Sequence, residues 1–121
     1  ACELNKKDEA SKFFEFATRM DLDDYNCNTC EGIHTTSIAA AWMNIVYGFG
    51  GLRSDKKTLS LSPMILDKWN KYSFKINYQD AHLKINVDKE KVVITNKGKK
   101  VSIKVYDTLY EISDQLIVEL K

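Results

Sequence analysis

Polar side chains gather at the start of an otherwise apolar segment of this sequence. They are one histidine and three hydroxyl residues in a row: His34, Thr35, Thr36 and Ser37. After Glu31 no Asp, Glu, Lys or Arg occurs until Arg53. A helix that begins here would present unpaired backbone N–H groups, the positive end of its dipole and several side-chain donors. These groups together favour an anion such as phosphate or sulfate.

Helix capping explains the same four residues without any ligand. Ser and Thr are strongly preferred at helix N-caps, where their side chains bond to backbone N–H groups. A single histidine is more often a structural residue than a ligand-binding one. On the local pattern alone, capping is the preferred interpretation and the anion site is the alternative.

Two further groups of residues could bind a metal or carry redox chemistry. Cys27 and Cys30 form a CxxC, but zinc normally takes four ligands and the chain holds no second CxxC. A redox CxxC normally begins a helix after a strand, whereas this one lies in a predicted loop. Asp21, Asp23 and Asp24 lack the EF-hand spacing and its terminal glutamate. We therefore predict no metal and no cofactor, and assign these aspartates to helix termination and solvation.

Four other side chains receive supporting or structural roles. Glu31 could orient His34, which would justify an acid beside an anion site. Trp42 and Trp69 are expected in the core rather than as sugar-binding platforms. His82 is expected in a turn, exposed to solvent.

The composition is that of a globular domain. The 121 residues are 44% hydrophobic and 29% charged, with a formal net charge of +1. This length indicates one domain, or a small domain with part of another. The charge balance offers no electrostatic argument for nucleic acid or an anionic membrane.

The start of the chain and its cysteines predict how it is processed and where it is located. The sequence begins Ala-Cys-Glu without a signal-peptide pattern, so we expect a processed or truncated chain. An odd number of cysteines, three, argues against a disulfide framework and favours a cytoplasmic location. The most apolar part, Ile38–Tyr47, is too short for the ~20 apolar residues of a membrane-spanning helix.

Two helices are predicted in the first half of the chain. Asp8–Met20 carries apolar residues at helical spacing, with Phe16 off the stripe and in need of a second packing partner. Asp21–Gly32 is turn-rich and predicts a loop. A second helix is predicted from about Thr35 to Tyr47, with Gly48 as the residue that follows its C-cap. Its interior is apolar on every side, which predicts burial all round.

From Leu59 onward the apolar period changes to two residues, which predicts short strands. The alternating runs are Tyr72–Tyr78, Leu83–Val87, Val92–Thr95, Val101–Val105, Leu109–Ile112 and Leu116–Leu120. Close, regular spacing of such strands predicts an antiparallel sandwich or barrel. Pro63 separates the helical part from the sheet part, so the boundary lies between Arg53 and Lys68. The fold class is α+β, and about 50 residues of helix and loop are too few for a core of their own.

Three segments resemble the C-terminal end of the glycoside hydrolase family 65 enzymes. They are DLDD…EGIHTTSIAAAWMNIVYGFGGLR, LSLSP and W…YSFKINYQDAHLKINV, in the family's order, from about Asp21 to Leu120. The GIHT-x-S element is specific, whereas the strands are generic support. This family contains the maltose, trehalose, kojibiose and nigerose phosphorylases.

The resemblance implies an architecture. These enzymes have an N-terminal β-sandwich, an (α/α)6 catalytic barrel and a small C-terminal jelly roll. Residues 1–53 would be the last helices of the barrel, and residues 54–121 the antiparallel jelly-roll domain. The family's general acid is an upstream glutamate that no residue here matches. We therefore assign no catalytic residue to this chain and expect it to be inactive alone.

The resemblance also implies a phosphate site, since His34, Thr35, Thr36 and Ser37 match the family's HT-x-S segment. Phosphate attacks the anomeric carbon of an α-linked glucose disaccharide with inversion, which yields β-glucose 1-phosphate. An inverting hydrolase needs a second carboxylate to activate water. In a phosphorylase, bound phosphate takes that place. The intact HTTS segment thus favours a phosphorylase over a family 65 hydrolase.

The sequence also leaves one other class of function open and indicates the partners of the chain. A noncatalytic β-sandwich that binds carbohydrate or protein is the main alternative, and exposed aromatics on one sheet face would favour it. The expected partners are inorganic phosphate and a disaccharide, with no nucleic acid and no membrane.

Without neighbouring barrel helices, the two apolar helices would leave a large patch, so we expect a homodimer. The sugar linkage is not determined, because the acceptor-side loops lie upstream.

Overall fold

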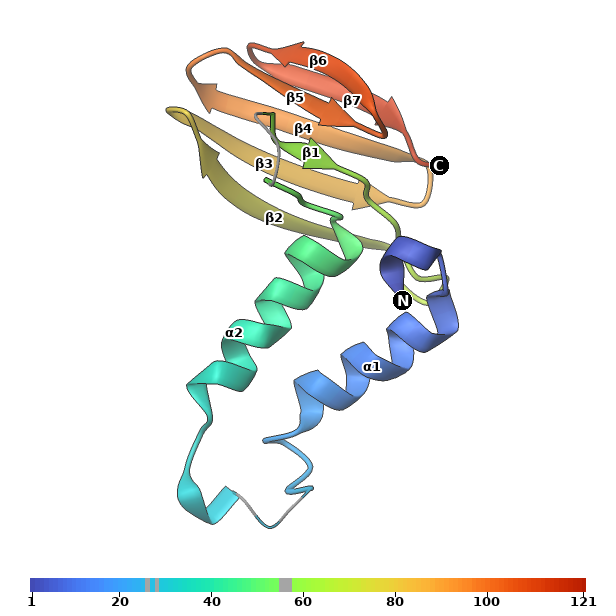
Figure 1. Ribbon diagram of the computed structural model, residues 1–121, viewed down its shortest axis with the longest axis vertical. Helices are drawn as coiled ribbons and strands as arrows, with labels where there is room; N and C mark the ends of the chain where they lie inside the picture. Colours follow the sequence, from blue (N-terminus) through green and yellow to red (C-terminus); the bar gives the residue numbers. More distant parts are fainter. Residues whose placement is uncertain (26, 28, 55–57) are drawn as a thin grey trace.

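The computed structural model describes residues 1–25, 27, 29–54 and 58–121, with Thr29 described by its backbone only. Two helices extend from a β-sandwich, lie near each other and are connected at the end far from the sheets (Figure 1). The chain is therefore α+β with helices first and sheets second, which confirms the predicted fold class. Within the described ranges, no helix is both long and apolar enough to cross a membrane.

The first helix, α1, spans Lys7–Arg19 and follows a short 3-10 turn, η1, at Cys2–Leu4. Its predicted bounds agree within one residue. Ala10 is buried where the helix meets the sandwich. Phe16 lies edge-on to the Tyr25 ring, with ring centroids 5.0 Å apart. Tyr25 is therefore the second packing partner that the off-stripe position of Phe16 predicted.

The second helix, α2, spans Thr35–Met43 and continues as a π-helical turn, η3, over Asn44–Phe49. The predicted end at Gly48 is wrong, because helical hydrogen bonding runs past this residue. The N–H of Gly50 donates to the carbonyl of Ile45 at 2.7 Å, the i to i−5 pattern of a π-helix. Gly48 thus lies inside the last turn.

Burial of the second helix on all sides is also wrong for this chain. No residue of α2 is buried, and Ile38 and Trp42 are 59% and 50% exposed. Only the π-helical turn reaches the core, through Val46 and Phe49. The sandwich covers just the end of the helical pair that adjoins it (Figure 1). Trp42, predicted as a core residue, therefore stays exposed.

The strands of the described part form two sheets. Their bounds are β1 Ser60–Leu61, β2 Lys71–Tyr78, β3 Ala81–Asp88, β4 Lys91–Gly98, β5 Val101–Val105, β6 Thr108–Ile112 and β7 Gln115–Glu119. One sheet has the order β2-β3-β4-β7 and the other β1-β5-β6. All strand pairs are antiparallel except β1 with β5, which are parallel and depart from the predicted pattern. Strand β1 also precedes Pro63, so the sheet begins before the residue expected to separate the two parts.

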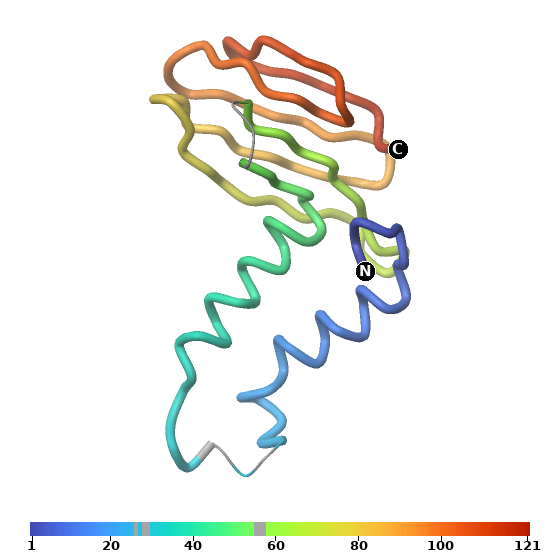
Figure 2. Tube along the Cα trace, viewed as in Figure 1, coloured from blue at the N-terminus to red at the C-terminus, as the bar shows by residue number. Residues whose placement is uncertain are grey.

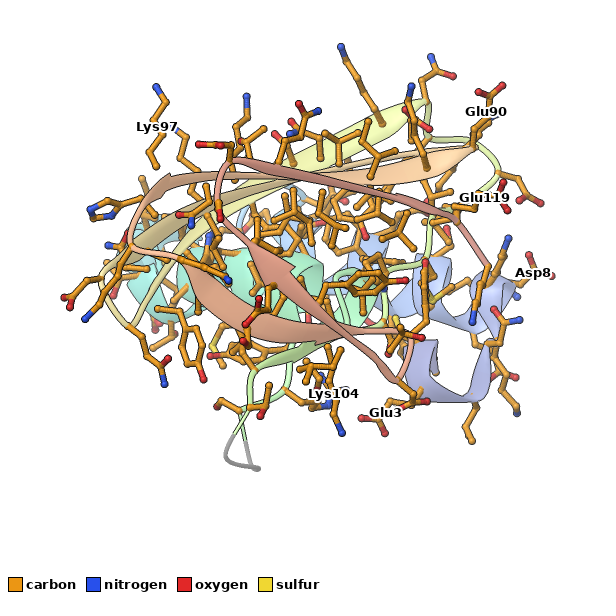
Figure 3. All side chains as sticks on the ribbon, turned by 90° about the horizontal axis from the view of Figure 1, so that it is seen from above. Glu3, Asp8, Glu90, Lys97, Lys104 and Glu119 are labelled. Carbon is orange, nitrogen blue, oxygen red and sulfur yellow. The ribbon has the colours of Figure 1, made fainter. Side chains whose placement is uncertain are left out.

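Alternate strand residues fill the space between the two sheets. On β3, Leu83, Ile85 and Val87 are almost fully buried, while the residues between them face outward. Figure 3 shows apolar side chains between the sheets and Lys97 pointing away from them. The two-residue alternation read from the sequence is confirmed.

A cluster of aromatic rings joins the helices to the sandwich. The Phe49 ring lies 5.4 Å from that of Phe14 and 4.6 Å from that of Trp69 between centroids. Trp69 in turn contacts Tyr72 at 5.8 Å. The Tyr72 hydroxyl lies 2.7 Å from the carbonyl oxygen of Phe49 and 2.9 Å from that of Met64. This cluster connects α1, the end of the second helix and strand β2, and contains Trp69 as predicted.

Candidate functional site

The polar segment His34–Ser37 lies at the start of α2. His34 is the N-cap residue, with φ −82° and ψ 99°, and Thr35 is the first helical residue. The helix start lies at the end of the helical pair away from the sandwich, next to the loop that follows α1 (Figure 2). The structure thus brings the four residues together within one turn, as their adjacency requires.

His34 is held by an aspartate that lies 13 residues earlier in the chain. Its backbone N–H donates to Oδ2 of Asp21 at 3.0 Å, and its ring Nδ1 lies 2.9 Å from Oδ1 of the same carboxylate. The Asp21 side chain is 18% exposed and that of His34 is 38% exposed. Because Asp21 accepts the proton of Nδ1, the other ring nitrogen, Nε2, is left for a further partner.

Ser or Thr capping, which the local sequence pattern favoured, is not what the structure shows. The N-cap residue is His34, and it makes no side-chain capping bond. Within the described part of the chain, the hydroxyls of Thr35, Thr36 and Ser37 have no hydrogen-bond partner. The N–H of Ser37 bonds to the His34 carbonyl at 2.9 Å, whereas those of Thr35 and Thr36 find no acceptor among the described residues. The helix start therefore presents several donors to its surroundings.

The residues just before His34 leave this start accessible. Glu31 ends a short 3-10 turn, η2 (Thr29–Glu31), and its Oε2 lies 3.9 Å from Nε2 of His34, beyond hydrogen-bond range. Gly32 has φ +95°, and no atom lies within 4 Å of where its Cβ would be. Asp21, and not Glu31 as the sequence suggested, therefore makes the contact that orients His34. The spacing of residues along the chain could not predict this contact, because a turn-rich loop separates Asp21 from His34.

The neighbouring acid Asp23 is paired with α1 and not with His34. Arg19 donates from Nε to Asp23 Oδ2 at 2.7 Å and from Nη2 to Oδ1 at 2.5 Å. These hydrogen bonds lower the pKa of the Asp23 carboxyl and raise that of the Arg19 guanidinium. The aspartates assigned to helix termination thus divide, with Asp23 bound to the helix end and Asp21 bound to His34.

The two cysteines of the CxxC are exposed free thiols. Sγ of Cys30 lies 3.4 Å from the carbonyl oxygen of Cys27. Asn28, between them, lies outside the described residues. Among the residues that the structure describes, no three His, Cys, Asp or Glu side chains gather in a way that could hold a metal ion. The absence of metal and redox roles stays a prediction.

A hollow in the described part of the chain lies elsewhere. It is a groove of about 560 Å³ between α1 and the end of the second helix. Its lining is mainly apolar: Ala1, Cys2, Glu3, Ala10, Phe13, Phe14, Phe16, Ala17, Met20, Asn44, Tyr47, Gly48, Phe49 and Arg53. None of the four polar residues takes part. The candidate site is therefore defined by its chemistry and not by this groove.

Comparison with known proteins places both halves of the chain in one family. The model for the glycosyl hydrolase family 65 central catalytic domain matches residues 1–43, and the model for the family's C-terminal domain matches residues 52–112. Maltose phosphorylase of Bacillus subtilis is 38% identical over 108 residues, covering 88% of this chain and 14% of that protein. Alpha,alpha-trehalose phosphorylase of Geobacillus stearothermophilus is 35% identical over 122 residues, covering 99% and 16%.

A solved structure is also similar along the whole chain. It is assigned as a kojibiose phosphorylase from the human microbiome, with a TM-score of 0.92 and 51% sequence identity. The match covers 100% of this chain and 18% of that one. The match to the central catalytic domain covers α1 and α2, and the match to the C-terminal domain covers strands β1 to β6. The chain belongs to glycosyl hydrolase family 65 and spans less than a fifth of the length of each of these relatives.

Proposed function

We propose that this chain is the C-terminal part of an inverting disaccharide phosphorylase. The enzyme uses inorganic phosphate to cleave an α-linked glucose disaccharide into β-glucose 1-phosphate and a sugar. The names of the maltose and trehalose phosphorylases among its relatives support this activity. The observation that carries the proposal is the helix start, where three hydroxyls and two backbone N–H groups lack partners among the described residues beside an oriented histidine.

In this proposal the helix start binds phosphate through His34, Thr35, Thr36 and Ser37. Donors and the helix dipole face the anion and hold it in place, which is positioning combined with electrostatic stabilisation. A phosphate oxygen forms a bond to the anomeric carbon while the bond from that carbon to the leaving sugar oxygen breaks. A general acid outside this chain gives that oxygen its proton. Bound phosphate replaces the second carboxylate of an inverting hydrolase.

We propose different roles for the two halves of the chain. Residues 1–53 contribute the last helices of the catalytic domain and its phosphate contacts, and residues 54–121 form the C-terminal jelly roll. Support comes from the two family models, which match on either side of residues 44–51. Residues 55–57, directly after the proposed boundary, lie outside the described residues. The chain alone lacks the general acid and is inactive.

Substitution of His34 in the complete enzyme tests the proposal. His34→Ala should raise the KM for phosphate or lower kcat, with a loss in kcat/KM for phosphate of about tenfold or more, which corresponds to about 1.4 kcal/mol. The matched control is His82→Ala, which removes an exposed histidine on β3 within the sandwich. Unchanged phosphate kinetics in His34→Ala would contradict the site. Release of free glucose, with no glucose 1-phosphate formed in phosphate buffer, would identify a hydrolase.

A further inference from the structure

Asp21 contacts His34 through both of its carboxylate oxygens. Oδ2 accepts the backbone N–H at 3.0 Å, and Oδ1 lies 2.9 Å from ring Nδ1. The Asp21 side chain is also more buried than that of Asp23 two residues later, with 18% against 45% exposed. Charge-assisted hydrogen bonds of this kind are short and directional. One carboxylate therefore restrains both the backbone and the ring of His34.

The backbone contact connects the two helices. Asp21 lies just beyond the last turn of α1, whose final residue is Arg19, and His34 is the N-cap of α2. The turn that carries Asp21 is itself bonded to the helix end, since the N–H groups of Leu22 and Asp23 donate to the Arg19 carbonyl at 2.9 and 2.8 Å. The end of α1 thus holds the start of α2 at a defined position.

The ring contact determines which nitrogen of His34 remains for a ligand. A carboxylate that accepts a hydrogen bond from Nδ1–H fixes the ring orientation, as it does for histidines that bind metals. The Glu31 carboxylate lies 3.9 Å from Nε2, outside bonding range, and among the described residues Nε2 has no hydrogen-bond partner. With Nδ1–H donated to Asp21, Nε2 can donate to an anion at the helix start only when the ring carries both protons, and the negative charges on either side of the ring favour that form.

We propose that Asp21 is the positioning residue of the phosphate site. It holds the His34 ring with Nδ1 toward itself and Nε2 toward phosphate, and it holds the first turn of α2 beside that ring. The inference rests on the proposed function and deepens it. Asp21 does not contact phosphate in this arrangement, because both of its oxygens are already bonded to His34.

The test is Asp21→Asn in the complete enzyme. Asparagine can still accept the His34 N–H, but it has no negative charge to favour the doubly protonated ring from which Nε2 donates to phosphate. The KM for phosphate should rise about 10- to 100-fold, the range for carboxylates that orient metal-binding histidines. The KM for the disaccharide and the melting temperature should stay unchanged. Asp21→Glu, which keeps the carboxylate, should recover part of the loss.

Asp23→Asn is the matched control, because it makes the same change in the same turn at a carboxylate that pairs with Arg19. Exposed pairs of this kind contribute little, and Asp23 bonds to Arg19 and not to His34, so phosphate kinetics should be unchanged. Equal effects of the two variants on phosphate KM would overturn the positioning role and assign the effect to the turn.

A double variant separates this inference from the proposed function. Asp21→Asn should add nothing to the phosphate defect of His34→Ala, because it acts through that ring. Additive losses would overturn the inference. A phosphate defect in His34→Ala together with normal kinetics in Asp21→Asn would also overturn it, and would leave the phosphate site standing. Normal phosphate kinetics in His34→Ala would instead contradict the proposed function itself.

Discussion

The Tyr72 hydroxyl connects the helical part of the chain to the sandwich. It lies on strand β2 within hydrogen-bond distance of the carbonyl oxygens of Phe49, at the end of the π-helical turn, and of Met64. Burial raises its pKa, and the negative charge that Tyr106 carries when ionised adds to the rise. The hydroxyl therefore stays protonated and able to donate throughout the physiological pH range.

Tyr72→Phe should lower the free energy of unfolding by about 0.5–1.5 kcal/mol, the usual net contribution of one hydrogen bond. Because folding raises the pKa of Tyr72, its contribution is complete below the unfolded pKa of about 10 and is lost as pH rises above it. Stability of the native chain should therefore fall above about pH 10, and that of the variant should fall less. Urea unfolding of the purified chain at pH 8 and pH 10.5 measures both.

The control for this substitution is Tyr25→Phe, at an exposed tyrosine outside the junction. It should leave both the stability and its alkaline dependence unchanged. An alkaline loss of equal size in Tyr72→Phe and the native chain would show that other groups cause it.

At the scale of elements, the exit from the second helix depends on Gly51. This residue has φ +60°, a backbone conformation that favours glycine, and its Cβ would lie 2.4 Å from the carbonyl oxygen of Ser62. Gly51 therefore allows the chain to leave η3 and pass close to the segment that follows β1. Here the backbone conformation and the close approach both require glycine.

Gly51→Ala should destabilise the fold by about 1–3 kcal/mol, the cost of forcing a side chain into this conformation. Gly48→Ala is the control, because Gly48 lies inside the helical turn and its Cβ would meet only Sγ of Cys2, at 3.6 Å. That change should be neutral or stabilising by up to about 1 kcal/mol. Thermal unfolding of the two variants gives the comparison, and equal melting temperatures would contradict the role of Gly51.

At the scale of the whole molecule, the helical pair is apolar and largely uncovered. The large side chains exposed on it are Phe13, Phe16, Ile38, Trp42, Met43 and Tyr47. Within the described chain the sandwich reaches only the near end of these helices (Figure 2). Because soluble monomers rarely expose contiguous apolar patches above a few hundred Å², we expect a partner to cover this face. In the proposed enzyme, other helices of the catalytic domain supply it.

The purified 121-residue chain should therefore associate, most simply as a twofold dimer that pairs these helices. Light scattering across a concentration series measures the molar mass. The double variant Ile38→Lys and Trp42→Lys should shift the chain toward a monomer, whereas Ile117→Lys, at an exposed apolar residue of β7, should not. A native chain that stays monomeric at high concentration would contradict the prediction.

The local patterns of this sequence determined its elements and the position of its candidate site. Helical spacing before Met20 and two-residue alternation after Tyr72 recur every few residues, so α1 and strands β2 to β7 could be predicted without knowledge of their neighbours. The polar residues His34–Ser37 adjoin one another, and any helix that begins there presents them together.

Tertiary structure alone decided the contacts between distant segments. The parallel pairing of β1 with β5, the exposure of Trp42 and the close approach of Gly51 to Ser62 depend on how the elements pack. The same holds for Asp21, whose sequence position indicated only the end of a helix. Its carboxylate reaches His34 because the chain reverses direction between the two helices. The periodicity of the side chains does not indicate which two residues such a reversal brings together.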